Sequence, residues 1–490
     1  MAINAGTNLN SVPAPQKQTL SSNYVDFTTT STEGWAQQYL PDLMEKEAEV
    51  FGQRTISGFL NKVGAEEAMQ SDRVVWSEQS RLHISLVGTI DLDGNVSSSG
   101  AKGKFTSVTD IDGNAITTTH GVRNHDIVLL ATAGKVSRCM VVAVDGADIG
   151  LRAFDEDVLT GHSEVASAAT LLVIGSEFKK GDTYDGQTAA DRGSNEPDFK
   201  TFTNKPIIMR DNYVVSGSDT SRIGWVEVTS EGGASGYLWY LKAEADTRAR
   251  FNDHLEMTML EAVKGSNSTN VDGELGYSTE SDAGTEGLFA AIEDRGNITT
   301  GVTGINAATD LAEFDAILAE FDKQGAIEEN MMFINRATSL AVDDMLASMN
   351  SYGAGGTSYG VFDNDEDMAL NLGFSGFRRG SYDFYKSDFR YLNDKATRGG
   401  INDAAGSAAI RGVMIPAGTS TVYDQSLGTN LKRPFLHVRY RASQTDNRRM
   451  KTWVTGSVGA ATSALDAMEI HMLSERCLIT QGANNFMLMK

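Results

Sequence analysis

Cysteine and proline are scarce in this chain of 490 residues, and both shortages exclude classes of protein. The two cysteines, Cys139 and Cys477, lie far apart in the sequence, so they indicate no disulfide framework and offer no paired spacing for a metal site. Only 7 prolines stand beside 49 glycines, which favours tight turns and extended segments over rigid proline-rich loops. We therefore expect two buried free thiols and a chain rich in β-structure.

Targeting signals, membrane spans and positive charge are also lacking. Residues 1–19 contain neither a basic n-region nor an apolar h-region, and no apolar run approaches the roughly 20 residues that cross a bilayer. The 42 Lys and Arg residues are outnumbered by 65 Asp and Glu, giving a formal net charge of -23. This excess favours solubility and disfavours sequence-independent binding to phosphate backbones. We expect a soluble chain that stays in the cytoplasm where it is made and contacts no membrane.

Recognisable catalytic and cofactor motifs are missing as well. The seven histidines form no HExxH pattern or Cys/His cluster, and no P-loop occurs. The segment GTSYG, residues 356–360, matches the nucleophile-elbow pattern around Ser358, but neither the preceding strand nor the following helix is indicated. The sequence therefore predicts no catalytic residue, no cofactor and no metal ion. A serine hydrolase that uses Ser358 is the enzyme alternative.

Three acidic segments imitate metal sites. DLDGN at 91–95 and DIDGN at 110–114 begin like calcium loops but lack the Gly and the Glu that such a loop needs further on. Asp-Gly between β-type runs is instead typical of hairpin turns. The densest acidic segment, residues 363–368, is interpreted as a solvated surface, with cation binding as the open alternative.

Periodic segments give the coarse organisation. Helical patterns cover 33–50, 54–70 and 237–264, and the last carries an apolar stripe along one side. Between residues 74 and 176 short β-type runs recur with turn signals between them, which favours a small antiparallel sheet or barrel. Residues 1–32 carry almost no charge and little apolar surface, so a disordered tail and an arm that orders against a neighbouring subunit both remain open.

A helix, a strand and a second helix follow one another near residue 330. Thr309 or Asp310 can cap the first helix, and Gly325 can end it. Residues 331–334 form an apolar strand, and the next residues show apolar positions at helical spacing. Asn335 stands at the break, and Asn335, Thr338 and Ser339 can all cap the second helix. Such junctions carry catalytic groups in many enzymes, so the break is either an active-site element or architecture.

The order of these parts resembles the major capsid protein of tailed bacteriophages, with the Hong Kong 97-type fold. The stretch MMFINRATSLAVDDML, residues 331–346, is similar to the core of the family's axial domain. MLSERCLITQGANNFMLM, residues 472–489, is similar to its closing strand with a Glu-Arg pair, here Glu475 and Arg476. PIIMRDNYVVSGS, residues 206–218, resembles the return strand of the extended loop before the spine helix. The likeness covers roughly residues 200–490, and its style is also similar to capsid proteins of crAss-like and related marine phages.

The resemblance implies an α+β fold and a division of the chain. It implies an N-terminal arm at 1–45, an extended loop at 46–215 with an inserted β-rich subdomain at about 100–200, a peripheral domain at 216–285 with the spine helix 237–264, an axial domain at 286–430, and closing strands at 431–490. Within these parts it assigns structural roles to Asn335, Glu475 and Arg476, and no cross-link residue can be aligned.

The implied function is self-assembly into hexamers and pentamers that form an icosahedral head enclosing double-stranded DNA, without sequence-specific binding. The implied partners are other copies of the chain, a scaffolding protein, a portal protein and cement or head-fibre proteins. The implied location is the virion, with the host cytoplasm during assembly. An encapsulin-like shell or a tail component is the alternative among self-assembling proteins.

Overall fold

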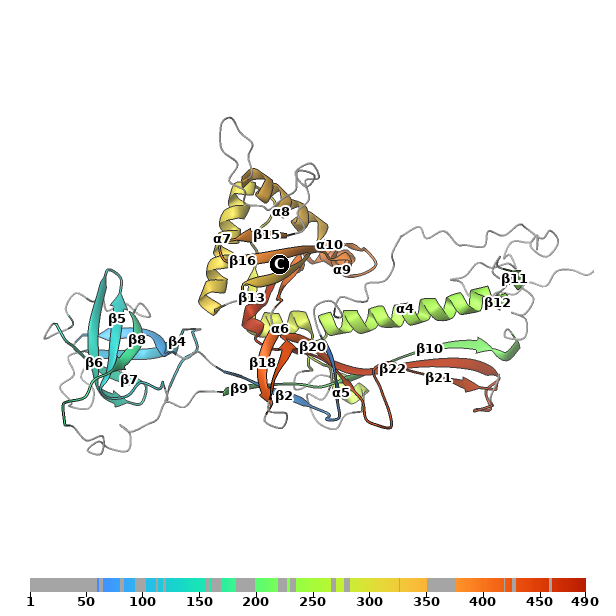
Figure 1. Ribbon diagram of the computed structural model, residues 1–490, viewed down its shortest axis with the longest axis horizontal. Helices are drawn as coiled ribbons and strands as arrows, with labels where there is room; N and C mark the ends of the chain where they lie inside the picture. The colour runs from blue at the N-terminus through green and yellow to red at the C-terminus, as the bar shows by residue number, and fades with distance from the viewer. Residues whose placement is uncertain are drawn as a thin grey trace, which may run out of the picture. The chain divides into compact units, whose positions relative to one another are not determined.

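The fold is α+β and divides into two compact units, Ser77–Phe202 and the remainder, Met1–Trp76 with Thr203–Lys490 (Figure 1). It is known from a computed structural model. The structure describes residues 60, 65–79, 83–92, 103–111, 113–117, 120–155, 159, 162, 169–181, 199–218, 227–229, 235–265, 270–276, 283–325, 327–349, 376–417, 419–424, 429–457 and 461–490. We call Ser77–Phe202 the barrel unit and the remainder the main unit.

The barrel unit is a closed barrel of six antiparallel strands in the order β3-β4-β7-β6-β5-β8. The strands are β3 (Ser85–Asp91), β4 (Lys104–Asp110), β5 (Asp126–Thr132), β6 (Lys135–Asp145), β7 (Asp148–Ala153) and β8 (Ala169–Ser176). Inward residues such as Phe105, Leu130 and Val141 form a buried core in the interior. Of the two predicted alternatives, a small antiparallel sheet or a barrel, the structure has the barrel, and alternation along each strand supplies one apolar face for its core.

Two strands join the units. β2 (Val74–Gln79) pairs with β9 (Phe199–Asn204) where the chain leaves and re-enters the main unit. Asn204 is fully buried at the end of β9: its amide nitrogen donates to the carbonyls of Glu286 and Leu478 at 3.0 and 2.6 Å. Asn204 belongs to the main unit, and its side-chain hydrogen bonds hold it to two other segments of that unit.

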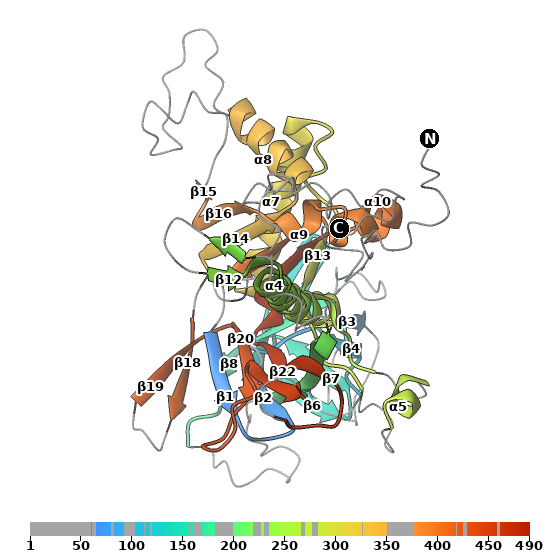
Figure 2. The same cartoon turned by 90° about the vertical axis from the view of Figure 1, so that its right-hand side faces the viewer.

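A five-stranded sheet under one long helix forms half of the main unit (Figures 1 and 2). Its path is β1-β20-β22-β10, and β21 pairs with the other half of β22. The strands are β1 (Ala65–Met69), β10 (Ile207–Ser216), β20 (Leu436–Arg441), β21 (Lys451–Gly456) and β22 (Ala467–Thr480). Helix α4 (Leu238–Glu261) lies within the predicted helical segment and packs Phe251 and Leu255 against Met472 of β22.

A six-stranded sheet in the order β13-β23-β17-β14-β16-β15 forms the other half. Its strands are β13 (Asn297–Thr299), β14 (Glu329–Ile334), β15 (Gly376–Arg379), β16 (Tyr382–Asp388), β17 (Gly412–Pro416) and β23 (Met487–Met489). Successive side chains of β14 point to opposite faces of the sheet and contribute to two hydrophobic cores. Met332 and Ile334 pack with α7 (Ala307–Gln324) and α8 (Arg336–Met349), whereas Phe333 packs with α6 (Leu288–Arg295). The sheet is therefore covered on both faces.

Smaller elements complete the described residues. They are β11 (Glu227–Thr229), β12 (Ser235–Tyr237), α5 (Asn270–Glu274), α9 (Arg390–Asn393), α10 (Arg398–Ala405), η4 (Gly406–Ala408), the hairpin of β18 (Thr419–Asp424) and β19 (Thr429–Pro434), and η5 (Ala483–Asn485).

Two local predictions were wrong. Residues 65–69, inside the predicted helix 54–70, form β1, because parallel pairing with β20 overrides the helix propensity of an Ala- and Glu-rich segment. Helix α7 is capped by Asn306, whose side chain accepts from the amide of Ala308 at 3.0 Å, and not by Thr309 or Asp310. The predicted arm 1–45 and helix 33–50 lie outside the described residues.

Candidate functional site

The break between β14 and α8 is built around Asn335. Its side-chain oxygen accepts a hydrogen bond from the amide of Thr338 at 2.8 Å, which is the geometry of a helix N-cap. Its own amide donates to the carbonyl of Arg411 at 2.8 Å, just before β17. One residue therefore fixes the start of α8 to the neighbouring strand of the sheet.

The polar groups around this junction bind one another. The amide of Arg336 donates to the side chain of Asn393 at 2.7 Å, and the Arg336 guanidinium pairs with Asp388. Deeper in the junction, Lys386 and Asp343 form an ion pair in which the two side chains are only 8% and 11% exposed. Because Lys386 lies on β16 and Asp343 on α8, this ion pair holds the helix against the strand.

Hydrogen bonds with charged side chains fix residues 300–304 of the loop before α7. The carboxylate of Asp310 is buried and accepts hydrogen bonds from the amides of Thr303 and Gly304 at 3.0 and 3.1 Å. The guanidinium of Arg411 donates to the carbonyls of Thr300 and Gly301 at 2.9 and 2.7 Å. Both ends of the loop are thus held by charged side chains on the helix and on the sheet.

This braced loop exposes one apolar side chain, and the helix that it contacts exposes another. Ile305 is 86% exposed, and Leu340 on the outer side of α8 is 55% exposed. The loop lies directly against α8, since a Cβ added at Gly304 would stand 3.1 Å from the Cβ of Ala341. We call Ile305 and Leu340 the apolar tip. Two large apolar side chains on hydrogen-bonded backbone are thus exposed in this part of the main unit.

The five-stranded sheet presents a second surface on the face opposite α4. There Arg210 of β10 lies 5.9 Å above the ring of Trp453, which in turn stacks on His471 at 5.1 Å. On the same face Ile208 and Val214 are each about half exposed. Among the described residues, this face therefore combines a stack of Arg210, Trp453 and His471 with exposed aliphatic side chains.

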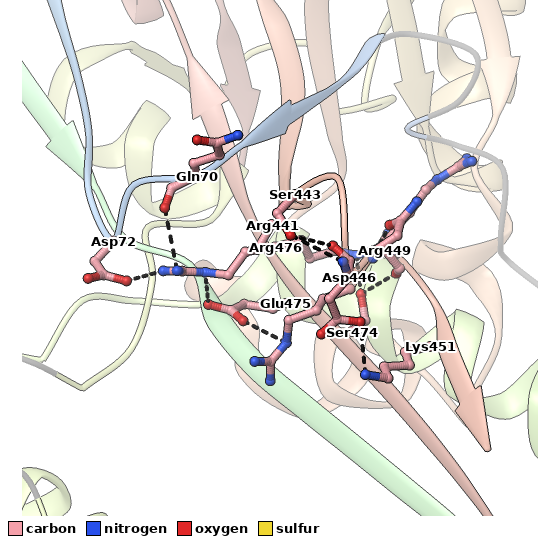
Figure 3. Close-up of polar contacts among 12 residues, drawn as sticks. Gln70, Asp72, Arg441, Ser443, Asp446, Arg449, Lys451, Ser474, Glu475 and Arg476 are labelled. Atoms are coloured by element: carbon pink, nitrogen blue, oxygen red, sulfur yellow. Dashed lines mark hydrogen bonds and ion pairs between the residues drawn. The ribbon is translucent and has the colours of Figure 1, made fainter. Parts of the chain in front are cut away.

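Glu475 lies on this sheet and binds two arginines (Figure 3). Its carboxylate forms ion pairs with Nε of Arg441 at 2.7 Å and with Nε of Arg448 at 2.9 Å, and its side chain is only 7% exposed. Arg441 also pairs with Asp72 and donates to the carbonyl of Gln70 after β1. The network therefore ties β22, β20 and the segment after β1 together.

Arg476 does not bind Glu475, because neighbouring strand residues point to opposite faces. Its guanidinium donates to the hydroxyl of Ser474 and to the carbonyl of Arg449, each at 2.8 Å (Figure 3). Burial lowers the pKa of this guanidinium from its ordinary value. The two residues of the sequence pair thus have separate structural partners.

Several predicted features lie outside the described residues. These are Ser358 with its segment 356–360, and the acidic segment 363–368. Among the residues that the structure does describe, no group of three or more His, Cys, Asp or Glu side chains could hold a metal ion, and no helix is long and apolar enough to span a membrane. Cys139 and Cys477 are buried free thiols, as expected, and burial raises the pKa of Cys477 to about 12.

Sequence reasoning did not single out Ile305, Leu340, Arg441 or Arg448. The exposed isoleucine follows Gly-Val-Thr-Gly, a turn signal that gives no measure of exposure. The two arginines could have been noticed in the sequence, because residues 439–451 contain five cationic side chains in a strongly acidic chain. Their pairing with Glu475 depends on strand order, which the sequence does not display.

No family model matches the chain, and no curated protein matches it. Solved structures are similar along nearly the whole length. The asymmetric unit of the bacteriophage PhiM1 mature capsid has 8% identity and a TM-score of 0.37, covering 91% of each chain. The capsid structure of the Cyanophage P-SCSP1u has 7% identity and a TM-score of 0.37, covering 94% of this chain and 95% of its own. A chain of Gordonia phage Cozz has 9% identity and a TM-score of 0.39, covering 97% and 99%. With TM-scores below 0.5 these remain similarities, and the function of this chain rests on its own residues.

Proposed function

We propose that this chain is the major capsid protein of a tailed bacteriophage, which assembles into hexamers and pentamers and forms the icosahedral head around double-stranded DNA. The apolar tip carries the proposal. Ile305 and Leu340 are exposed on backbone that is braced by buried hydrogen bonds, so their position is not an accident of a loose loop. Such groups gain most when another protein covers them, and a self-assembling subunit supplies that protein as further copies.

The layered main unit supports the finer assignment. In this proposal α4 is the spine helix of the peripheral domain 216–285, and the six-stranded sheet with α7 and α8 belongs to the axial domain 286–430. The strands after residue 431 complete both domains. The barrel is the subdomain inserted in the extended loop 46–215, and residues 1–45 are the arm. Asn335 then sets the direction of an axial helix, and Glu475 and Arg476 fix the closing strand β22.

The remaining partners follow from the same proposal. A scaffolding protein, a portal protein and cement or head-fibre proteins would join the shell, which is found in the virion and in the host cytoplasm during assembly. A net charge of -23 suits a container that encloses DNA and later releases it. A crAss-like or marine phage origin is a narrower hypothesis that the genes beside this one would test.

The test compares two substitutions on the outer side of α8. Leu340→Asp places a carboxylate in the proposed contact, so the yield of assembled particles should fall by about tenfold or more. Asp344→Asn changes an exposed residue one turn further along the helix and should leave the yield close to that of the unmodified chain. Sedimentation separates particles from subunits, and circular dichroism verifies that both variants are folded.

Equal yields from the two variants would contradict a contact at the tip. Particles that hold cellular protein instead of DNA would favour an encapsulin-like shell, and tubes or rings without shells would favour a tail component. Hydrolysis of an ester substrate that Ser358→Ala abolishes would favour the enzyme alternative.

A further inference from the structure

The barrel has an outer surface that is apolar on one side. Along β5, Val128 and Leu130 are fully buried in the interior, whereas the alternate residues are only half-buried and point outward. The strand registers set outward residues of β6 and β8 beside them, since Val136 pairs with Ala131, Met140 with Ile127, and Leu172 with Leu129. We call these six residues the apolar wall: Ile127, Leu129, Ala131, Val136, Met140 and Leu172.

The other side of the barrel is polar. Thr106 and Lys104 of β4 face outward, and Lys104 forms an ion pair with Asp148 of β7 at 2.6 Å. Asp91 of β3 is paired with Lys104 in the register, and Asp145 of β6 is paired with Asp148. The inward residues already form the buried core of the barrel, so this core does not account for an apolar outer side. On this wall Val136 is 66% exposed and the other five residues are partly exposed, so the wall is an apolar surface that a partner could cover.

The charge around the wall indicates what binds there. Arg138 is the outward residue paired with Leu129, Arg152 is paired with Met140, and Lys135 begins β6 beside Val136. These three charged residues beside the wall are cations, whereas the anions Asp145 and Asp148 lie at the turn that joins β6 and β7. The chain itself carries a net charge of -23, so another copy carries a net charge of the complementary sign.

We propose that the apolar wall of the barrel binds the acidic surface of a second copy of this chain. The two surfaces differ, so the contact is head to tail, and contacts of this kind repeat around a ring or a closed shell. The inference rests on the proposed self-assembly for its setting, but it assigns a contact to the barrel that is independent of the apolar tip.

Photo-cross-linking in the full-length chain tests the contact directly. Benzoylphenylalanine in place of Val136 should give, on irradiation, a covalent dimer whose adduct maps to an acidic peptide of the second copy. The matched control carries it in place of Ile111, which is 48% exposed just after β4 and lies off the wall. Arg138→Glu should lower the dimer yield from position 136 by about tenfold, whereas Arg138→Lys should leave it unchanged.

Electron microscopy of the same samples keeps the two proposals separate. Particles without a dimer from position 136 would overturn the wall contact and leave the capsid function standing. A dimer from position 136 in samples that never form particles would support the wall contact and count against the capsid function. Adducts of position 136 with a different protein, or equal dimers from position 111, would overturn the assignment to a second copy.

Discussion

Replacing Glu475 with Ala should destabilise the main unit markedly. The substitution removes a carboxylate that is 7% exposed and that pairs with Arg441 and Arg448 at 2.7 and 2.9 Å. Two arginines would then be left facing each other across a site that lacks the anion between them. The same substitution removes the link between β22 and the segment that follows β1 (Figure 3).

The magnitude follows from the exposure of the partners. Breaking a buried ion pair by removing one partner costs about 3 to 5 kcal/mol. The side chains of Arg441 and Arg448 are 28% and 29% exposed, and Arg441 keeps its contact with Asp72. Both arginines can therefore regain some hydration, so we expect a loss of about 3 kcal/mol, at the lower end of that range.

The assay is urea unfolding of the unassembled subunit, followed by tryptophan fluorescence, since Trp453 lies in the same sheet. Glu475→Gln keeps the volume and removes the charge, and most of the loss should persist in that variant. Asp446→Asn is the control, because Asp446 and Lys451 form a pair whose side chains are each 43% exposed, and its unfolding midpoint should stay close to that of the unmodified chain. A loss below about 1 kcal/mol for Glu475→Ala at an unchanged slope would refute the reasoning.

Three further changes test the main unit. Asn335→Ala removes the N-cap acceptor and should cost about 1 kcal/mol and lower the yield of particles, whereas Asn335→Ser keeps an acceptor and most of the stability in urea unfolding. Lys386→Met leaves the Asp343 carboxylate buried without its cation and should cost about 3 kcal/mol, and adding Asp343→Leu should recover much of that loss in a double-mutant cycle. Burial and a hydrogen bond to Asp322 raise the pKa of Tyr382 to about 12, above the value of about 10 in an unfolded chain. The contribution of Tyr382 to stability is therefore complete below pH about 10 and is lost as the pH rises towards 12. Tyr382→Phe should flatten this part of a plot of unfolding free energy against pH.

The sequence predicts features that depend on local chemistry. The apolar strand before Asn335, the helix after it and the side-chain oxygen that caps the helix all follow from residues within one turn of each other. Gly325 ends α7 with a φ of 67°, a conformation that glycine adopts without strain. The barrel was predicted for the same reason, because alternation and turn residues are local signals.

Features set by distant partners escaped prediction. Residues 65–69 have the composition of a helix, but Glu66 and Glu67 pair with Arg449 and Arg439 once β1 lies beside β20. Asp310 is a residue type that often caps helices, yet its carboxylate accepts a hydrogen bond from the preceding loop, and Asn306 is the N-cap of α7. In both cases the competing conformation is favoured by contacts that form only after the chain folds.

The candidate site shows the same division. Glu475 and Arg476 could be named from the sequence as a pair, but strand alternation sends them to opposite faces and to partners on β20 and the loop that follows it. The apolar tip and the apolar wall could not be named at all, because exposure is a property of the folded surface and both consist of ordinary aliphatic residues. The same apolar residue types occur in a hydrophobic core and in an exposed binding surface, so residue type alone does not distinguish the two.

Negative-stain electron microscopy of the purified chain, expressed alone and together with its neighbouring genes, tests the capsid proposal most directly. We expect closed shells, or rings of five and six subunits, in at least one of these samples. A uniform monomer under every condition would contradict self-assembly and would return attention to Ser358 as a catalytic residue.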